Sequence, residues 1–295
     1  MNIPEEIWKL GEERQAARQA RDFALADRLR DRLADLGWEI FDQAGSFELR
    51  AKLKYTAIEN LRAVTAIIEP CEIAIAMFIQ GFEEDAVTTV KSIRQFTDIP
   101  IVLLSLGDAG QLVEVIDAKT TVLKINEECG WGPAANALLQ NIPSQFVIIM
   151  DPSTRFLGDA IAPAFAQLKE GTFSGVGWKG GLINVDDGWR SVDDKGPGEV
   201  DVLFSYFLAL DRQAALEVGG FNARALYYRN ADIEFSLRMR HAGGHLLQMD
   251  LPLMQDRHHG YHDVDSDFRE VQSKKNYDRI LERFRGKNAI LSPRR

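Results

Sequence analysis

Short apolar runs alternate with amphipathic segments over residues 72–150. Residues 72–79 form an almost continuous apolar run, whereas residues 84–96 place their apolar side chains at helical spacing. The same pattern predicts strands at 99–104, 121–125 and 145–150, and a helix around 133–139. Buried strands that alternate with helices indicate an α/β fold with a parallel sheet, whose ligands gather at the carboxyl ends of the strands. That edge is expected to carry Gln80, Ser105, Asn126 and Asp151.

The first fifty or so residues have a different pattern. Pro4 suits the first turn of a helix, and Asp22 can cap a second helix whose apolar stripe runs to Leu36. Gly37 can end that helix in the left-handed conformation, and the residues that follow alternate around Ala44-Gly45 like a short hairpin. The pattern predicts a small module of two helices and a β-hairpin over residues 1–54, followed by an α/β domain over residues 55–295.

The composition of the chain excludes several classes of protein. The chain has 295 residues, of which 45% are hydrophobic and 27% charged, enough apolar material for a folded core. Its formal charge of -9 disfavours general nucleic-acid binding. Two cysteines are too few for a disulfide framework or a four-cysteine zinc site, and they suit a reducing cytosol. With an acidic start and only strand-sized apolar runs, we expect a cytoplasmic protein without a signal peptide or membrane span.

Residues 17–31, together with Leu33 and Leu36-Gly37, resemble the C-terminal helical segment of cysteinyl-tRNA synthetases. In that family the segment lies near the tRNA. Here the basic residues are balanced by about as many acids, and no synthetase catalytic domain follows. We therefore do not expect tRNA as a partner, and a docked helical hairpin with a solvated charged face explains the same residues.

Three passages of the larger domain, in this order, resemble inverting glycosyltransferases of the GT-A fold, family 2, and specifically the rhamnosyltransferase-like branch. Residues 126–136 resemble that branch's Asn-x-Gly-Phe-Gly-x-Ala-x-Asn segment, with extra residues before Gly130. Residues 146–154 resemble its strand ending in Asn-Pro-Asp-Thr. Residues 218–222, followed by 231–234 and Arg238, resemble its Gly-Gly-Phe-Asp and Glu-Asp-x-Asp motifs. The resemblance implies a GT-A mixed sheet flanked by helices, and transfer of a hexose-type sugar from a nucleoside-diphosphate donor to a hydroxyl acceptor on a glycan, small molecule or protein.

The resemblance also implies a divalent cation, Mn²⁺ or Mg²⁺. Departure of a nucleoside diphosphate develops negative charge, which a carboxylate-held cation neutralises. By resemblance the cation ligands are Asp151, Ser153 and His258, although Ser153 replaces the family's second acid. Asp151 also has a structural interpretation, as the first residue of an Asp-Pro-Ser-Thr turn.

Asp232 matches the family's general base, which takes the proton of the acceptor hydroxyl. Glu234 is expected to assist by stabilising positive charge on the sugar ring. The motif departs from the family because Ala231 replaces its first acid. Asp232 is equally well placed to cap the helix that follows, and a cap can also be a base.

For the nucleotide, the resemblance implies binding by residues at and after the ends of the first strands: Gln80, Ser105, Asp108, Asn126, Gly132 and Asn136. Ser105 stands where the family has an acid that meets the base, and Asp108 is the candidate replacement. The polar, Gly-rich residues 186–199 are either a lid or acceptor loop or a solvated connector.

All five histidines fall between His241 and His262. The family places one near the metal and diphosphate, and His258 fits that position. A zinc site is the alternative, because 241/245 and 258/262 are each four residues apart, and exposed loop histidines are a third interpretation. Acids are expected at three positions that carry Ser105, Ser153 and Ala231 here. The alternative is therefore a degenerate transferase fold that only binds its ligand and is associated with RNA or translation through the first module.

Overall fold

A computed structural model of the chain describes residues 3–52, 54–65, 68–255 and 265–294. The chain divides into two compact units, Met1–Lys54 and Tyr55–Arg295. Each is described by itself.

The first unit contains helices α1 (Glu5–Gln19) and α2 (Phe23–Asp35) and the antiparallel strands β1 (Trp38–Gln43) and β2 (Ser46–Ala51). The predicted cap is confirmed, because the carboxylate of Asp22 accepts the backbone N–H of Leu25 at 3.0 Å. Gly45 has a φ of 79°, which the tight turn between the strands requires. A small apolar core holds the helices against the hairpin; it contains Ile7, Leu10, Leu29, Leu33 and Leu49.

The second unit is built on a sheet that, within the described residues, has nine strands in the order β12–β15–β9–β14–β7–β4–β5–β6–β3. The bounds are Thr56–Ile58 (β3), Cys71–Gln80 (β4), Ile101–Leu106 (β5), Thr120–Ile125 (β6), Ser144–Met150 (β7), Gly175–Gly177 (β9), Gly198–Val200 (β12), Phe207–Asp211 (β14) and Leu246–Gln248 (β15). Strands β4 to β7 run parallel, as the sequence predicts, and β3, which the sequence analysis did not predict, pairs parallel with β6. The sheet as a whole is mixed, because β14 pairs antiparallel with both β7 and β9.

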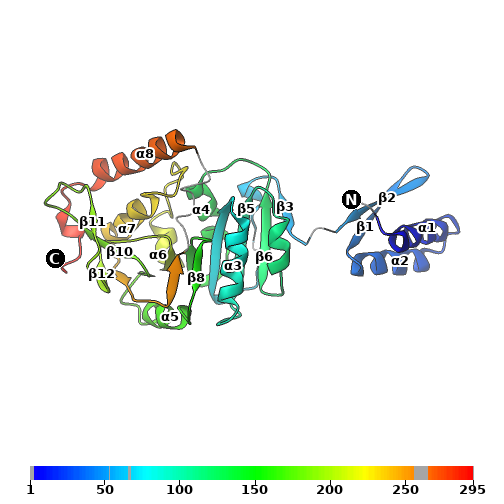
Figure 1. The fold of residues 1–295 in the computed structure, drawn as a ribbon, viewed down its shortest axis with the longest axis horizontal. Helices are drawn as coiled ribbons and strands as arrows, with labels where there is room; N and C mark the ends of the chain where they lie inside the picture. The colour runs from blue at the N-terminus through cyan, green and yellow to red at the C-terminus, as the bar shows by residue number, and fades with distance from the viewer. Residues whose placement is uncertain (1–2, 53, 66–67, 256–264, 295) are drawn as a thin grey trace. The chain divides into compact units, whose positions relative to one another are not determined.

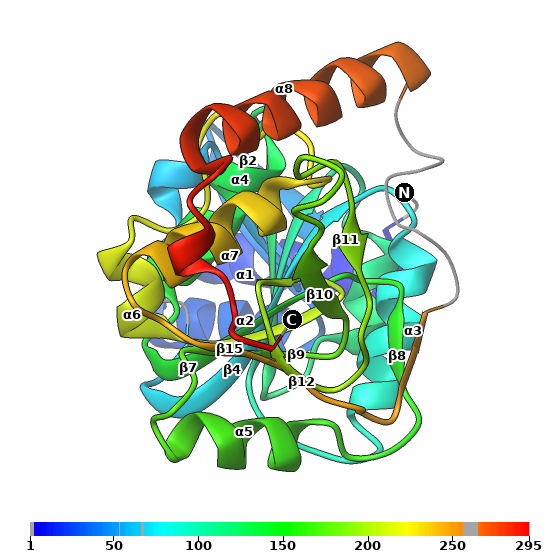
Figure 2. The same cartoon turned by 90° about the vertical axis from the view of Figure 1, so that its left-hand side faces the viewer.

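Helices cover both faces of this sheet (Figures 1 and 2). One face packs against α4 (Trp131–Asn141), α6 (Arg212–Glu217) and α7 (Ala231–His241). The other packs against α3 (Glu83–Ile93), α5 (Ile161–Lys169) and the 3₁₀ turn η2 (Gln111–Val115). Alternate residues of β4 explain the arrangement, because Ala74 and Ala76 face the first layer while Ile75 and Met77 face the second.

Two smaller sheets and a long C-terminal helix complete the unit. Strands β10 (Gly180–Ile183), β11 (Val192–Asp193) and β13 (Val202–Leu203) form one sheet, and β8 (Thr154–Phe156) pairs with β16 (Leu253–Gln255). The remaining 3₁₀ turns are η1 (Leu61–Ala63) and η3 (Asn288–Ile290). Helix α8 (Ser266–Phe284) lies along α7 (Figure 2) and joins it and β13 in an apolar cluster. None of the described helices is long and apolar enough to cross a lipid bilayer.

Candidate active site

The carboxyl edge of the parallel strands carries several of the predicted residues. Gln80 ends β4 half-buried, Asn126 follows β6 in an exposed position, and Asp151 follows β7. Ser105 is different, because it lies inside β5 with a fully buried hydroxyl that has no hydrogen-bond partner among the described residues. Asp108 lies in an exposed turn, where its carboxylate accepts the N–H of Gly110 at 2.8 Å. The structure therefore brings Gln80, Asn126 and Asp151 to one edge and leaves the Ser105 side chain in the interior.

Asp151 is oriented by Ser153. The backbone N–H and the hydroxyl of Ser153 both donate to Asp151 Oδ1, at 2.8 and 2.6 Å. Ser153 is itself 1% exposed. The residue that stands where an acid was expected thus fixes the direction of the neighbouring carboxylate.

Asp232 lies in the first turn of α7 and is 6% exposed. The N–H and hydroxyl of Ser205 donate to its Oδ2 at 3.0 and 3.3 Å, and the N–H of Ile233 donates to Oδ1 at 2.9 Å. Burial raises the pKa of Asp232 to about 6, and these donors, which favour the ionised form, limit the rise. The carboxyl group can therefore be ionised at neutral pH while remaining an effective base.

The N-cap of α7 is Asn230, in the left-handed conformation with a φ of 68°, and not Asp232. The capping interpretation of Asp232 is wrong in this respect, because the helix begins one residue before it, at Ala231. Its carboxylate still accepts one N–H of the first helical turn, from Ile233.

Consecutive residues connect the two acids. Ser205 donates to the carboxylate of Asp232, and the carbonyl oxygen of Tyr206 accepts the N–H of Asp151 at 3.2 Å. Because two residues extend about 7 Å at most, the Asp232 carboxylate and the Asp151 backbone lie no more than roughly 14 Å apart. Residues 81 positions apart in the chain are thus held near one another by the short segment between β13 and β14.

Glu234, the other predicted catalytic acid, does not lie at the pocket that contains Asp232. It is 2% exposed, its two oxygens accept from Asn222 Nδ2 at 2.8 and 3.0 Å, and Arg279 of α8 pairs with it at 3.3 Å. Residues two apart in a helix point to different sides, so Asp232 and Glu234 cannot share a face of α7. Glu234 connects α7 to the loop before it and to α8, and it does not line the pocket described below.

Gly132 and Asn136 also make contacts within the fold. Asn136 Nδ2 donates to the carbonyl of Phe221 at 2.8 Å, and its Oδ1 accepts the N–H of Phe221 at 2.7 Å. A Cβ on Gly132 would lie 2.3 Å from the carbonyl oxygen of Asn222, so only glycine permits this approach. Both residues hold the Gly-Gly-Phe-Asn loop against α4.

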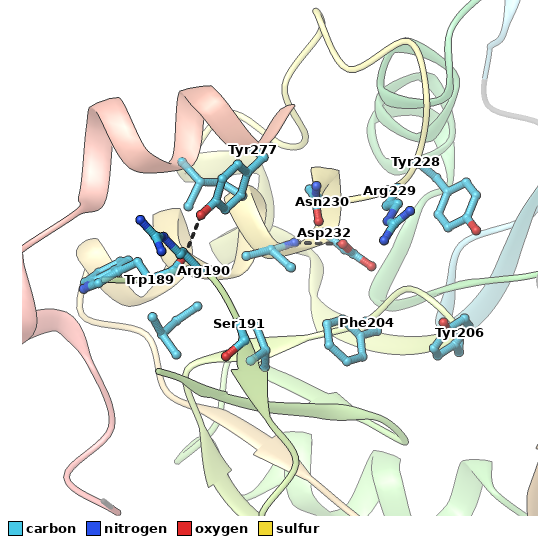
Figure 3. A pocket seen from close by; sticks show the side chains of 14 residues that line it. Trp189, Arg190, Ser191, Phe204, Tyr206, Tyr228, Arg229, Asn230, Asp232 and Tyr277 are labelled. Carbon is cyan, nitrogen blue, oxygen red and sulfur yellow. Dashed lines mark hydrogen bonds between the residues drawn. The ribbon is translucent and has the colours of Figure 1, made fainter. Parts of the chain in front are cut away.

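A pocket of about 350 Å³ contains Asp232 (Figure 3). Its lining comes from β10, β11, the segment before β14, the start of α7 and helix α8. The lining residues are Ile183, Trp189, Arg190, Ser191, Val192, Phe204, Tyr206, Tyr228, Arg229, Asn230, Asp232, Ile233, Tyr277 and Ile280.

Two tyrosines relate this pocket to Asp151. Tyr206 and Tyr228 lie close together at one side of the pocket in Figure 3. Burial raises the pKa of the Tyr228 phenol, and the charge of Asp151 contributes to the rise. The backbone of Asp151 also donates to the carbonyl oxygen of Tyr206 at 3.2 Å, so Asp151 lies beside a residue that lines the same pocket as Asp232.

Sequence reasoning missed most of the lining. The exception is part of the polar stretch 186–199, whose Trp189, Arg190, Ser191 and Val192 form one wall. The later part of that stretch is not a loop at the pocket, because β12 joins the main sheet beside β15. Three further lining residues, Tyr228, Arg229 and Asn230, directly precede the acidic motif in the sequence. Their position next to Asp232 in the chain could have identified them as pocket residues.

The histidines do not form a described metal site. His241 ends α7 with its ring against Phe284, and His245 lies 3.0 Å from Glu199 through Nδ1. The described part of the chain has no group of three His, Cys, Asp or Glu side chains that could hold a metal ion. The zinc interpretation has no ligand set at 241/245, whereas His258, His259 and His262 lie outside the described residues.

Comparison with known proteins supports the fold. No protein-family model matches the sequence. The cysteine–tRNA ligase of Opitutus terrae is 42% identical over 52 residues, which are 18% of this chain and 11% of the ligase. Among solved structures, the chain is similar to GalNAc-T7 with UDP, GalNAc and Mn²⁺, at a TM-score of 0.56 and 15% identity over 72% of this chain and 48% of that one. It is also similar to the mannosyltransferase PcManGT from Pyrobaculum calidifontis in complex with GDP-Man and Mn²⁺, at a TM-score of 0.53 and 15% identity over 73% of this chain and 66% of that one.

The chain thus spans about a tenth of the ligase, about half of GalNAc-T7 and about two-thirds of the mannosyltransferase. At 15% identity the structural likeness establishes the fold alone. The α/β GT-A fold predicted from the sequence is confirmed, whereas family 2 and the rhamnosyltransferase-like branch stay predictions.

Replacing Asn136 tests whether its contacts are structural. Asn136→Ala removes two hydrogen bonds and leaves the N–H and C=O of Phe221, which is 1% exposed, without these partners. We expect the free energy of unfolding to fall by about 2–4 kcal/mol in urea denaturation. Asn141→Ala is the matched control on the same helix, because Asn141 bonds only to its own helix at Ala137, and it should cost less than about 1 kcal/mol. Equal stability of the two variants would contradict the structural role.

The raised pKa of Asp232 makes the stability of the protein depend on pH. In the folded protein this carboxyl binds its proton more tightly than in the unfolded chain, so its contribution is present at low pH and is lost as pH rises through about 6. The stability of Asp232→Asn relative to wild type should therefore rise by about 2–3 kcal/mol between pH 4 and pH 7, whatever its value at pH 4.

Denaturation of both proteins across this pH range measures the difference. Asp187→Asn is a control of opposite sign, because the hydroxyl of Ser191 lowers the pKa of Asp187, and that variant should lose relative stability as pH rises. If the difference in free energy of unfolding between Asp232→Asn and wild type does not change with pH, the Asp232 carboxyl does not have the raised pKa described here.

Proposed function

We propose that this protein is an inverting glycosyltransferase that moves a hexosyl group from a nucleoside-diphosphate sugar to a hydroxyl acceptor. The observation that carries the proposal is the placement of two acids by consecutive residues: Ser205 holds the carboxylate of Asp232, and Tyr206 holds the backbone of Asp151. The acids differ in environment, since Asp232 is buried in a pocket and Asp151 follows the end of β7, a central strand of the sheet. The structures of GalNAc-T7 and PcManGT, which contain sugar nucleotides or their parts, support the reaction class.

Asp151 is the proposed anchor for the donor diphosphate and its cation. A carboxylate oxygen and a neighbouring hydroxyl are hard donors of the kind that Mn²⁺ and Mg²⁺ accept, and the donor's phosphates and water complete such sites. The residues present fit the cation, and both similar structures contain Mn²⁺. When bound, the cation supplies positive charge that offsets the charge developing on the leaving diphosphate. His258 stays a proposed further ligand, and Gln80 and Asn126 are proposed to contact the nucleotide.

Asp232 is the proposed general base. The acceptor oxygen forms its bond to the anomeric carbon while the bond from that carbon to the diphosphate oxygen breaks, and the hydroxyl proton passes to the Asp232 carboxylate. A single displacement of this kind inverts the configuration of the anomeric carbon. The three donors from Ser205 and Ile233 fix the direction of the carboxylate, so it need not reorient during the reaction.

Glu234 is not part of this proposal for the chemical step. Its contacts with Asn222 and Arg279 assign it to positioning the start of α7, on which Asp232 lies.

Turnover by variants of α7 tests the assignment of the base. Asp232→Asn keeps a similar shape but removes the base, so turnover should fall by about 10²–10⁴-fold while donor binding changes little. Turnover of the wild type should fall below pH about 6, as the carboxyl becomes protonated.

The control for this experiment is Glu234→Gln, which weakens the ion pair with Arg279. It should lower the melting temperature more than Asp232→Asn does at pH 7.5. Near-normal turnover of Asp232→Asn with any donor would remove Asp232 from the role of base. If no UDP- or GDP-sugar binds the wild-type protein with Mn²⁺, a binding protein built on the same fold becomes the better description.

Calorimetry with UDP or GDP and Mn²⁺ tests Asp151. Asp151→Asn should weaken Mn²⁺-dependent nucleotide binding by at least about 100-fold, because it removes the charged ligand. Ser153→Ala leaves the carboxylate but removes one of its orienting donors, and should weaken binding by about tenfold. Asp98→Asn, an exposed acid of the same unit, is the control. Unchanged binding by Asp151→Asn would refute the assignment.

A further inference from the structure

The pocket around Asp232 has two chemically different ends. In Figure 3 Asp232 lies in the middle, with Arg229, Tyr228 and Tyr206 on one side and Arg190, Trp189 and Tyr277 on the other. The Tyr206 end adjoins Asp151, the proposed anchor of the diphosphate, because the carbonyl oxygen of Tyr206 accepts the N–H of Asp151 at 3.2 Å. The Arg190 end therefore lies beyond the base, away from the donor, where the rest of an acceptor molecule would extend.

A strained turn places Arg190 at that end. Gly188 and Trp189 both have left-handed backbones, with φ of 76° and 74°. This conformation is costly for a residue as bulky as tryptophan, and such strain persists only where surrounding contacts enforce it. Trp189 is 4% exposed in a cluster with Ile280 and Phe284 of α8, and its carbonyl accepts the Tyr277 hydroxyl at 3.2 Å. Burial of the indole and this hydrogen bond hold the turn.

Side-chain hydrogen bonds fix the same turn from inside. Asn184 Oδ1 accepts the N–H groups of Asp186 and Asp187, at 3.0 and 3.1 Å. The oxygens of Asp187 in turn accept the N–H of Arg190 at 2.7 Å and the hydroxyl of Ser191 at 2.6 Å. The backbone of Arg190 is therefore specified, although its side chain is exposed.

The opposite wall is strained as well. Asn230 is left-handed, and its Nδ2 donates to the carbonyl of Ser273 on α8 at 3.1 Å. The described residues contain four non-glycine positions with positive φ, and two of them, Trp189 and Asn230, line this one pocket. Strain of this kind concentrates at binding and catalytic sites.

The charges of the lining indicate what the pocket would accept. Two arginines, Arg190 and Arg229, line it in a protein whose formal charge is -9, and Asp232 is the one acid among the lining residues. Arg229 lies on the donor side of Asp232 in Figure 3, where negative charge comes from the diphosphate. Arg190 lies on the other side, where a second negative group must come from the acceptor. Phe204 and Tyr277, which also line the pocket, offer aromatic surface against which a sugar ring of the acceptor can pack.

We propose that the acceptor carries a negatively charged group, phosphate or carboxylate, which binds Arg190 while the reacting hydroxyl lies at Asp232. The assignment of the reacting hydroxyl rests on the proposed function; the binding of the anion by Arg190 does not. Guanidinium groups bind both anions through paired, charge-assisted hydrogen bonds, so the two sources share one chemistry.

Three probes with a common aglycone test the proposal: p-nitrophenyl glucoside, its 6-phosphate, and p-nitrophenyl glucuronide. Their binding to the full chain with UDP and Mn²⁺ is measured by calorimetry. One or both anionic probes should bind at least about tenfold more tightly than the neutral one, and Arg190→Gln should abolish that preference. Comparison of the 6-phosphate with the glucuronide shows whether the pocket prefers a phosphate or a carboxylate. Arg224→Gln, an exposed arginine outside the lining, should preserve the preference.

Equal affinity for the three probes, a preference that survives Arg190→Gln, or no binding of any probe at millimolar concentration would overturn the proposal. Arg190→Lys provides a second variant in case Arg190→Gln folds poorly, and it should retain only part of the preference because an ammonium lacks the paired geometry. Failure of the proposed function has a different signature. In that case Arg190-dependent anion binding persists, but no sugar is transferred from any donor.

Discussion

The position of the Asp232 carboxylate depends on hydrogen bonds made by the short segment between β13 and β14. A carboxylate that is 6% exposed would be destabilised without donors, and within the described part of the chain Ser205 supplies two of its three donors from other residues. Tyr206, the next residue, accepts the N–H of Asp151. The same peptide segment therefore sets the position of both acids, and β14, the antiparallel strand that follows it, secures the segment against β7. A displacement of this segment would move both acids together.

A second set of contacts fixes the start of α7. Glu234 holds Asn222 and Arg279, while Asn136 holds the backbone of Phe221, so α4, α7, α8 and the Gly-Gly-Phe-Asn loop are joined through buried polar groups. These residues belong to the motifs that pointed to a sugar transferase, yet their side chains face the protein interior. The motif thus combines one residue that lines the pocket with several that support it, which agrees with the general need to hold a reactive group rigidly.

The fold could be predicted from sequence to a large extent, because buried strands and amphipathic helices leave strong periodic signals. The strands β4 to β7 and helices α3 and α4 lie where the periodicity places them. The antiparallel pairing of β14 (Phe207–Asp211) with β7 could not be predicted, because an apolar run does not indicate whether its strand pairs parallel or antiparallel. At the site, the family resemblance identified Asp151 and Asp232 as candidates. It also led to the expectation that Glu234 assists Asp232, whereas residues two apart in a helix do not share a face. Phe204, Tyr206 and Tyr277 escaped prediction as pocket residues, because α8 and the segment before β14 meet β10 and β11 only through tertiary packing.

Ser153 shows why a departure from a motif need not remove its function. A second carboxylate beside Asp151 would add repulsion between like charges, which only a tightly held cation could offset. With serine there, Asp151 is instead oriented by a neutral donor at 2.6 Å, so this position carries one negative charge and not two. A site with a single carboxylate binds a divalent cation weakly unless the ligand brings further charge. Under the proposed function, a nucleoside diphosphate would bring such charge, so the substitution would favour joint binding of cation and donor over a cation that is permanently resident.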